Sequence, residues 1–437
     1  MSMQTLPRPY EPDSLARFST PSESEPAVFG RIMDRYIRPL IHGSQVRGPF
    51  TDERTARIRP IEVEAPGRIR VRLERESEDH FILERPVPFS PSEVALLTRI
   101  AENLAQYSHE QYALSPVLIG SAIEQAIAWS MNADYADTVY QVLQIYTQWA
   151  SETHEGKRTA HTTGIYCNKT GSGAGRFSFP CHPEWLKQLG STPDTLLAVA
   201  QDGSILGTEL VSSKLNNYKK DQDILAPIGT ADIAMWANTR HKVAVSLTDY
   251  GDILVFRNKQ LVFAKRRSCW RSFPHSLVIR EVIPPSLDDA EQKSRKAVYL
   301  TALDIALMHR GACLGVFPQG GASGQCRELV RPEMLFSAPV QSPDARLLSR
   351  MVGERKFYEI PRKLRVELCS LDGALLLDAS GTILTAGAIV KTEGNAAAGG
   401  GRSAAARSLA RRGFGIKISN DGYIEIFCGE NPPVQFA

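Results

Sequence analysis

The chain has 437 residues, of which 43% are hydrophobic and 23% are charged, and these proportions are ordinary for a globular protein. Its length exceeds that of a typical single domain, so we expect about two or three domains. With 51 basic and 48 acidic residues the formal charge is +3. This near balance argues against a protein-wide field that would attract nucleic acid or membranes.

The sequence also bears on location. Segment 1–10 has no apolar core of the length found in signal peptides, and no apolar run approaches the length of a membrane span. The seven cysteines lie far apart and form no CxxC pair, so we predict neither a zinc knuckle nor a disulfide framework. We therefore expect a protein of the reducing cytoplasm that makes no membrane contact.

The amino-terminal part mixes several kinds of structure. Residues 1–90 are rich in Pro, Ser, Arg and Glu, which predicts an extended arm with an edge strand or two. Ser90, Pro91 and Glu93 follow the pattern of a helix cap, a first-turn proline and a capping-box acid. A second helical region is expected over 115–151. From 164 to 280, short apolar runs broken by glycine and asparagine predict strands, including a hairpin that turns at Asn258-Lys259.

After a boundary at Pro284-Pro285-Ser286 the pattern becomes an alternation of helices and strands. Ser286 is expected to cap a helix that Gly311 ends, and Ser342 a helix that Gly353 ends. Strands are expected at 312–317, 364–369, 374–378 and 383–390. A glycine-rich loop at 394–401 precedes a short helix at 403–411, and a hairpin turns at 420–422. The fold class is therefore α/β with an α+β amino-terminal part. Its last domain, 291–437, is expected to have a central mixed sheet flanked by helices.

Three features of this last domain suggest chemistry. Glycines followed by Arg402 immediately before a helix (399–402) can bring backbone N–H groups and a guanidinium to a phosphate, although such glycines are more often turn residues. Asp372 at the start of an apolar strand can bind a metal ion or activate a ribose hydroxyl. Its simpler interpretation is a turn acid, with Gly373 supplying an unusual backbone angle. The segment 311–314 is core by composition, and its small residues leave room for a flat base.

Together, in this order, these pieces resemble the diadenylate cyclase domain family, whose members join two ATP molecules into cyclic di-AMP and release pyrophosphate. The resemblance covers residues 296–428. The family carries Gly-Ala-Leu-Ile, Asp-Gly-Ala, Gly-Thr-Arg-His-Arg and Ser-Glu-Glu motifs. Their counterparts here are Gly311-Ala312-Cys313-Leu314, Asp372-Gly373-Ala374, Gly400-Gly401-Arg402-Ser403-Ala404 and Ser419-Asn420-Asp421.

The resemblance implies a division of roles. Asp372 would bind Mg²⁺ or Mn²⁺ and help to activate the 3′-hydroxyl group, and Arg402 would act with it in catalysis by holding phosphates. The implied nucleotide-binding residues are Gly311, Ala312, Leu314, Gly373, Ala374, Gly400, Gly401, Ser403, Arg407 and Asp421. The resemblance further implies a homo-oligomer in which two such domains face each other, each presenting one ATP. It also implies a sensor domain of the DACNV type over residues 91–290.

The sequence departs from the family at the phosphate motif. Ser403 stands where the family has histidine, and Ala404 where it has a second arginine. Arg407, Arg411 or Arg412 could supply the missing charge. Two functions therefore stay open, a cyclase under the control of a sensor region and a nucleotide-binding sensor that makes no product.

Other segments have simpler interpretations. Segment 265–271 mixes cations with an indole, as a nucleotide or nucleic-acid stacking site does, but a solvated strand end fits the near-neutral charge better. Segment 170–176 matches neither the Walker nor the dinucleotide pattern and is expected to be a loop. Cys167, Cys181 and His182 lack a fourth ligand at metal-site spacing. His309 ends a helix, where a cation interacts favourably with the dipole.

Overall fold

A computed structural model of the chain describes residues 25–41, 43–51, 60–72, 79–85, 87–109, 115–154, 157–171, 175–177, 184–192, 194–211, 224–282, 287–392, 400–429 and 434–436. The chain divides into two compact units, Met1–Tyr140 and Gln141–Ala437. The domain boundaries predicted near residues 90 and 290 stay predictions.

The first unit contains a sheet where the sequence predicted an arm with one or two edge strands. Its four antiparallel strands are β1 (Gln45–Thr51), β2 (Ile61–Ala65), β3 (Arg68–Val71) and β4 (Asp79–Glu84), in the order β1-β4-β3-β2. The short helix α1 (Glu25–Ile32) precedes the sheet. The strands are more numerous than predicted, and β1 and β2 are almost wholly exposed, with Ile61 their one buried residue.

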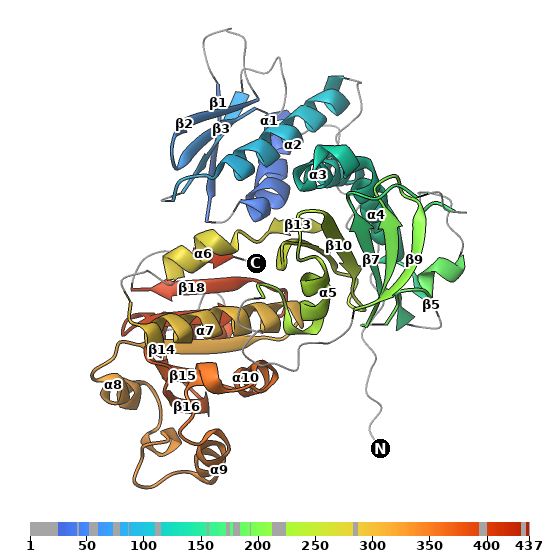
Figure 1. Ribbon diagram of the computed structural model, residues 1–437. Helices are drawn as coiled ribbons and strands as arrows, with labels where there is room; N and C mark the ends of the chain where they lie inside the picture. Colours follow the sequence, from blue (N-terminus) through green and yellow to red (C-terminus); the bar gives the residue numbers. More distant parts are fainter. Residues whose placement is uncertain are drawn as a thin grey trace, which may run out of the picture. The chain divides into compact units, whose positions relative to one another are not determined.

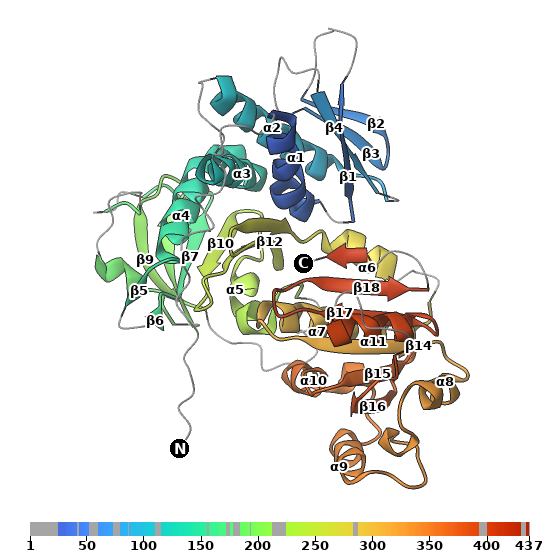
Figure 2. The same cartoon turned by 180° about the vertical axis from the view of Figure 1, so that it is seen from behind.

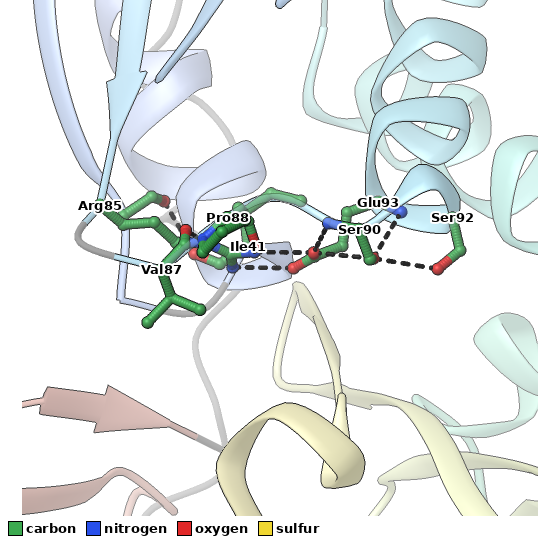
Figure 3. Close-up of polar contacts among 8 residues, drawn as sticks. Ile41, Arg85, Val87, Pro88, Ser90, Ser92 and Glu93 are labelled. Atoms are coloured by element: carbon green, nitrogen blue, oxygen red, sulfur yellow. Dashed lines mark hydrogen bonds and ion pairs between the residues drawn. The ribbon is translucent and has the colours of Figure 1, made fainter. Parts of the chain in front are cut away.

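The helix predicted after Ser90 is confirmed as α2 (Pro91–His109). Its capping box is complete: the Ser90 backbone N–H donates to Glu93 Oε2 at 2.8 Å, and the Glu93 N–H donates to Ser90 Oγ at 3.3 Å. Arg85 joins this cap by two hydrogen bonds to the Glu93 carboxylate, as Figure 3 shows. The second helical region consists of two helices, α3 (Pro116–Met131) and α4 (Ala136–Trp149).

The second unit begins with a seven-stranded sheet in the order β13-β12-β11-β10-β7-β8-β9. Only β7 and β8 in it are parallel. The strands are β7 (His161–Tyr166), β8 (Thr195–Ala200), β9 (Ile205–Leu210), β10 (Lys242–Leu247), β11 (Ile253–Arg257), β12 (Gln260–Arg266) and β13 (Cys269–Ser272). The predicted hairpin turn at Asn258-Lys259 is confirmed, with positive φ at both residues. Around this sheet lie a two-residue ribbon, β5 (Thr153–His154) with β6 (Lys157–Arg158), and the helices α5 (Ala231–Trp236) and α6 (His275–Val282).

A six-stranded mixed sheet follows, in the order β16-β15-β14-β17-β18-β19. The strands are β14 (Ala312–Phe317), β15 (Ala374–Asp378), β16 (Ile383–Ala388), β17 (Phe414–Ile418), β18 (Ile424–Cys428) and β19 (Val434–Phe436). Helix α7 (Asp289–Leu307) covers one face in Figure 1, and α11 (Gly400–Ala410) covers the other in Figure 2. The remaining helices are α8 (Ala322–Leu329), α9 (Pro343–Val352) and α10 (Arg362–Cys369). The α/β class predicted for this part, a mixed sheet flanked by helices, is confirmed.

Two glycines let α11 approach the sheet closely. A Cβ atom on Gly315 of β14 would lie 2.7 Å from a methyl group of Leu376 and 3.0 Å from one of Leu409, and a Cβ on Gly415 of β17 would collide with the backbone of Ala406. Because real side chains do not tolerate such distances, these positions accept only glycine without a shift of the helix. The close packing fixes where the amino terminus of α11 lies over the sheet edge.

Two predictions for this part were wrong. Segment 364–369 lies in helix α10 rather than in a strand. The buried residues of that helix include Arg362, Arg365, Val366 and Cys369, which follow helical spacing. The signal was hidden since two of these are arginines. The cap of α7 is Asp288, whose side chain accepts from the Glu291 N–H at 2.8 Å; Ser286 and the two prolines before it lie outside the described residues.

Candidate functional site

Some of the predicted site residues meet where several elements begin or end at one edge of the six-stranded sheet, formed by the ends of its central strands. Strands β14 and β15 are parallel, with Cys313 paired to Ala374, so Gly311 and Asp372 both precede their strands at this edge. Strand β17 runs antiparallel to β14, with Ile418 paired to Ala312, so the turn at Asn420 emerges at the same edge. Both flanking strands lie about 4.8 Å from β14. The edge thus places the start of two strands and one turn within the length of a nucleotide.

Arg402 lies directly over Gly311. Its Nη1 donates a hydrogen bond to Asn420 Oδ1 at 3.2 Å. A Cβ atom on Gly311 would collide with both the guanidinium of Arg402 and the side-chain oxygen of Asn420. Glycine at 311 is therefore required for this arrangement. Burial raises the pKa of the neighbouring Cys313 thiol to about 12, and the charge of Arg402 acts against that shift.

The amino terminus of α11 is open to solvent. Gly400 and Gly401 are exposed, and a Cβ atom on either would meet nothing within 4 Å. Free backbone N–H groups of a first helical turn and the positive end of the helix dipole favour an anion here. Together with the Arg402 guanidinium, this end of α11 can hold phosphate oxygens. Gly399 lies outside the described residues.

The segment before β15 adopts the unusual backbone angle that the sequence suggested. Gly373 has φ +110°, and a Cβ atom there would lie 2.8 Å from the backbone nitrogen of Ala388. A side chain is therefore excluded at 373 by both conformation and space. Asp372 is exposed beside it, so its carboxylate is accessible to a metal ion or a ribose hydroxyl.

Several predicted site residues do not join this group. Ser403 is 3% exposed, so its hydroxyl is removed from solvent. Arg407 lies about 140° around the helix from Arg402, with its guanidinium 5.8 Å from the ring centre of Phe427. Arg412 pairs with Glu328 at 2.7 Å near the far end of α11, about 15 Å along the axis from Arg402. Arg402 is therefore the cation of this motif that the fold places at the edge.

The small residues of β14 and β15 divide between the two faces of the sheet. Ala312 and Leu314 belong to the core shared with α7. Cys313 and Ala374 belong to the core shared with α11. Successive side chains along a strand point to opposite faces of the sheet, which produces this division. Ala374 therefore lies on the face that carries Arg402, whereas Ala312 and Leu314 lie on the other.

Asp421 faces the seven-stranded sheet instead of solvent. Its carboxylate interacts electrostatically with Arg266 and Arg271, and both of those residues are buried, at 4% and 5% exposure. The prediction that segment 265–271 is a solvated strand end was wrong, since Trp270 is also only 1% exposed. Arg266 and Arg271 pack against the last sheet of their own unit, whereas Lys265 donates to Thr147 of α4 at 2.9 Å and Arg267 is exposed.

Sequence reasoning missed the residues that hold this junction. Asp252 Oδ2 accepts from Arg266 Nε at 3.1 Å and lies 2.8 Å from His309 Nε2. The Tyr250 ring stacks on His309 with centroids 4.5 Å apart. His309 thus pairs with a carboxylate from another sheet rather than only ending a helix. Partners 57 residues apart in sequence leave no local signal.

A metal ion implied by the family resemblance would meet one carboxylate of the described residues at this edge, that of Asp372. Among the residues that the structure describes, no group of three or more His, Cys, Asp or Glu side chains could hold a metal. Magnesium commonly binds through one or two carboxylates together with water and substrate phosphates. Asp372 fits that mode, in which the nucleotide supplies the remaining ligands. Cys167, the described member of the cysteine–histidine group weighed above, donates from Sγ to the Ile165 carbonyl at 3.8 Å. Cys181 and His182 lie outside the described residues.

Comparisons with known proteins gave weak similarities. No protein-family model matches the sequence, and no curated protein matches it. A solved structure described as a hypothetical membrane spanning protein from Bacillus cereus matches 37% of this chain and 70% of its own, at 13% identity and a TM-score of 0.27. A double mutant of DacA from Staphylococcus aureus matches 34% of this chain and 90% of its own, at 16% identity and a TM-score of 0.25. The chain is thus partly similar in structure to both, and the function proposed below rests on neither.

The helices differ in length and in apolar character. None of those in the described parts of the chain is both long and apolar enough to cross a membrane.

Proposed function

We propose that the part of the chain from 291 to 437 binds ATP and acts as a diadenylate cyclase, producing the second messenger cyclic di-AMP. The observation that carries this proposal is the meeting of Gly311, Arg402 and Asn420 at the open amino terminus of α11, at the edge where Asp372 precedes β15. This arrangement offers a helix amino terminus and the Arg402 guanidinium for phosphate, and the Asp372 carboxylate for a metal ion, at one edge of the sheet.

In this reaction the protein forms no covalent bond to either ATP. The 3′-oxygen of one ATP attacks the α-phosphorus of the other, a P–O bond forms, and the bond to pyrophosphate breaks. The hydroxyl proton leaves towards Asp372, and a second transfer in the opposite sense closes the ring. Positioning and neutralisation of charge carry most of the rate enhancement in such reactions.

Each residue has a part in this scheme. The N–H groups at Gly400 and Gly401 and the guanidinium of Arg402 hold phosphate oxygens, while Gly373 and Ala374 shape the floor beside the sugar. A bound Mg²⁺ or Mn²⁺, held by Asp372 and by phosphate oxygens, would neutralise the triphosphate. Because each ATP must meet another, the active form is a homo-oligomer with two such edges face to face.

A second function is favoured by one observation. Ser403 is buried and Arg407 lies on another side of α11. Arg402 alone would therefore contact phosphate where the family motif has several cations. A domain that binds ATP or cyclic di-AMP without turnover would act as a nucleotide sensor. Nucleic acid and membranes are not proposed partners.

Arginine variants separate these functions. For Arg402→Ala we expect cyclic di-AMP formation to fall by about 100-fold, as when a charged transition-state contact is removed, and for Arg407→Ala by less than about 3-fold. Product is measured by mass spectrometry and ATP affinity by equilibrium titration. Arg346→Ala, on the exposed side of α9, is the control.

Three results would change this conclusion. Equal losses for Arg402→Ala and Arg407→Ala would contradict the assignment of Arg402. ATP binding without product in the wild-type chain would favour the sensor. Absence of both would remove the proposed site.

A further inference from the structure

The turn at 419–423 joins β17 to β18 and carries Asn420, the partner of Arg402. Its own hydrogen bonds are those of a hairpin: the Gly422 N–H donates to the Ser419 carbonyl at 2.9 Å, and the Ser419 N–H donates to the Tyr423 carbonyl at 2.9 Å. The orientation of Asn420, and through it that of Arg402, therefore depends on what holds this turn against the rest of the unit.

Two arginines of the seven-stranded sheet lie against the turn. The Arg266 guanidinium, at the end of β12, occupies the space that a Cβ atom on Gly422 would need. The Arg271 guanidinium, on β13, lies 3.8 Å from the centre of the Tyr423 ring. Gly422 has φ +88°, so a glycine is needed there for conformation as well as for room. The turn is thus packed on side chains that come from a different sheet.

Arg266 is itself fixed in place. Its Nε donates to Asp252 Oδ2 at 3.1 Å, and both side chains are about 4% exposed or less. The same Asp252 oxygen lies 2.8 Å from His309 Nε2, two residues before Gly311. One buried pair from the seven-stranded sheet therefore supports both chain segments that frame Arg402, the approach to Gly311 and the turn of Asn420.

We infer that Arg266 is a positioning residue for the nucleotide site, holding the 419–423 turn so that Asn420 orients Arg402. The inference rests on the proposed function in naming that site. It also assigns the seven-stranded sheet a part in that function, because a displacement of β12 or β13 changes the support of Asn420 without any contact to nucleotide.

A double-mutant cycle between Arg266→Lys and Asn420→Ala in the full chain tests this inference. Lysine keeps a positive charge for Asp252 but lacks the forked guanidinium that reaches Gly422. We expect each single variant to lower kcat for cyclic di-AMP formation by about 10-fold, since small misplacements are costly. We expect the double variant to stay near about 10-fold, because both changes act on one contact. Losses that multiply to about 100-fold would overturn the inference.

A second pair of variants guards against a folding defect in Arg266→Lys. Gly422→Ala places a methyl group against Arg266. Gly429 also has a positive φ, +59°, but a methyl group added there would meet no atom within 4 Å, so Gly429→Ala is the matched control. We expect Gly422→Ala to lower kcat by about 10-fold and Gly429→Ala to change it by less than about 2-fold. Equal effects of the two would overturn the inference.

Failure of the proposed function is distinguishable from failure of this inference. If the wild-type chain makes no product, the cycle is read on the ATP dissociation constant instead. Amide hydrogen exchange needs no nucleotide at all: Arg266→Lys is expected to speed exchange at 419–423 by at least about 10-fold. Unchanged exchange at this turn would overturn the inference whatever the nucleotide assays show.

Discussion

Arg85 in the first unit and Arg266 in the second are both buried arginines, and they differ in how their guanidinium groups are hydrogen-bonded. In the first unit, Arg85 donates from Nη1 and Nη2 to both oxygens of Glu93 at 2.8 and 2.7 Å. Its Nε donates to the Val87 carbonyl and its Nη2 to the Pro88 carbonyl, both at 2.9 Å. Figure 3 shows these contacts between the short connection from β4 to α2 and the first turn of α2, with Ile41 drawn among the contacting residues. The four bonds from Arg85 named above are local in sequence.

In the second unit, Arg266 has one charge-assisted bond, from Nε to Asp252. Its Nη2 is buried, and no acceptor among the described residues lies within hydrogen-bond reach of it. The rest of the guanidinium packs against the backbone at Gly422 of another sheet. An arginine whose hydrogen bonds are satisfied locally stabilises its own segment, whereas one that joins two sheets transmits position between them. The comparison predicts that Arg85 variants change stability and Arg266 variants change activity.

The largest expected effect is that of Arg85→Met. It leaves the Glu93 carboxylate buried without its counter-ion, so we expect the first unit to lose about 3–5 kcal/mol of unfolding free energy. Hydrogen exchange over 79–109 measures this loss. The control is Arg38→Met, which removes an exposed pair with Asp34 and should cost no more than about 1 kcal/mol. Equal losses for the two would contradict the account of Arg85.

The next prediction compares the unfolding free energy of Arg266→Lys with its turnover. Since lysine preserves the charge beside Asp252, we expect the second unit to lose less than about 1.5 kcal/mol, while turnover falls by about 10-fold. Urea unfolding followed by hydrogen exchange at β10 and β11 provides the stability value. A variant that loses several kcal/mol and keeps its turnover would place Arg266 in the same structural class as Arg85.

The smallest expected effect is the loss at low pH of the stability that Glu93 contributes to the first unit. Burial acts to raise the pKa of Glu93, but the hydrogen bonds from Arg85 and Ser90 together outweigh it and hold the pKa below the ordinary value of 4.5. A carboxyl with a lowered pKa contributes stability that is present above pH 4.5 and lost as pH falls through its folded-state pKa. We expect the difference in exchange at 79–109 between wild type and Glu93→Gln to be constant above pH 5 and to shrink below about pH 4.5. A difference that grows on acidification would contradict this sign.

Features set by neighbouring residues could be predicted from the sequence. The capping box of Ser90 and Glu93, the cap at Ser342 and the helix end at Gly353 each need only one turn of chain, and the structure has all three. Helix α8 and strand β19 were not predicted. The other strands and helices after 311 followed from the same local patterns, apart from α10. That helix was missed because Arg362 and Arg365 are buried, Arg362 by two hydrogen bonds to Asp304 at 2.6 and 2.7 Å.

What depends on tertiary packing could not be predicted. The motif order placed Gly311, Asp372 and Arg402 in one candidate site, but the burial of Ser403 and the side of α11 that carries Arg407 depend on how the helix lies on the sheet. The support of Asn420 comes from Arg266, which is more than 150 residues away in the chain. The charges of segment 265–271 suggested solvent because their partners are distant in sequence.

The central claim is that the edge carrying Asp372 and Arg402 joins two ATP molecules. The most direct measurement incubates the purified full-length chain with ATP and Mn²⁺, and separately with Mg²⁺, and detects products by mass spectrometry beside Asp372→Asn. We predict cyclic di-AMP from the wild-type chain and at least about 100-fold less from the variant. Cyclic di-AMP at equal levels from both proteins, or none from the wild type with either metal, would contradict it.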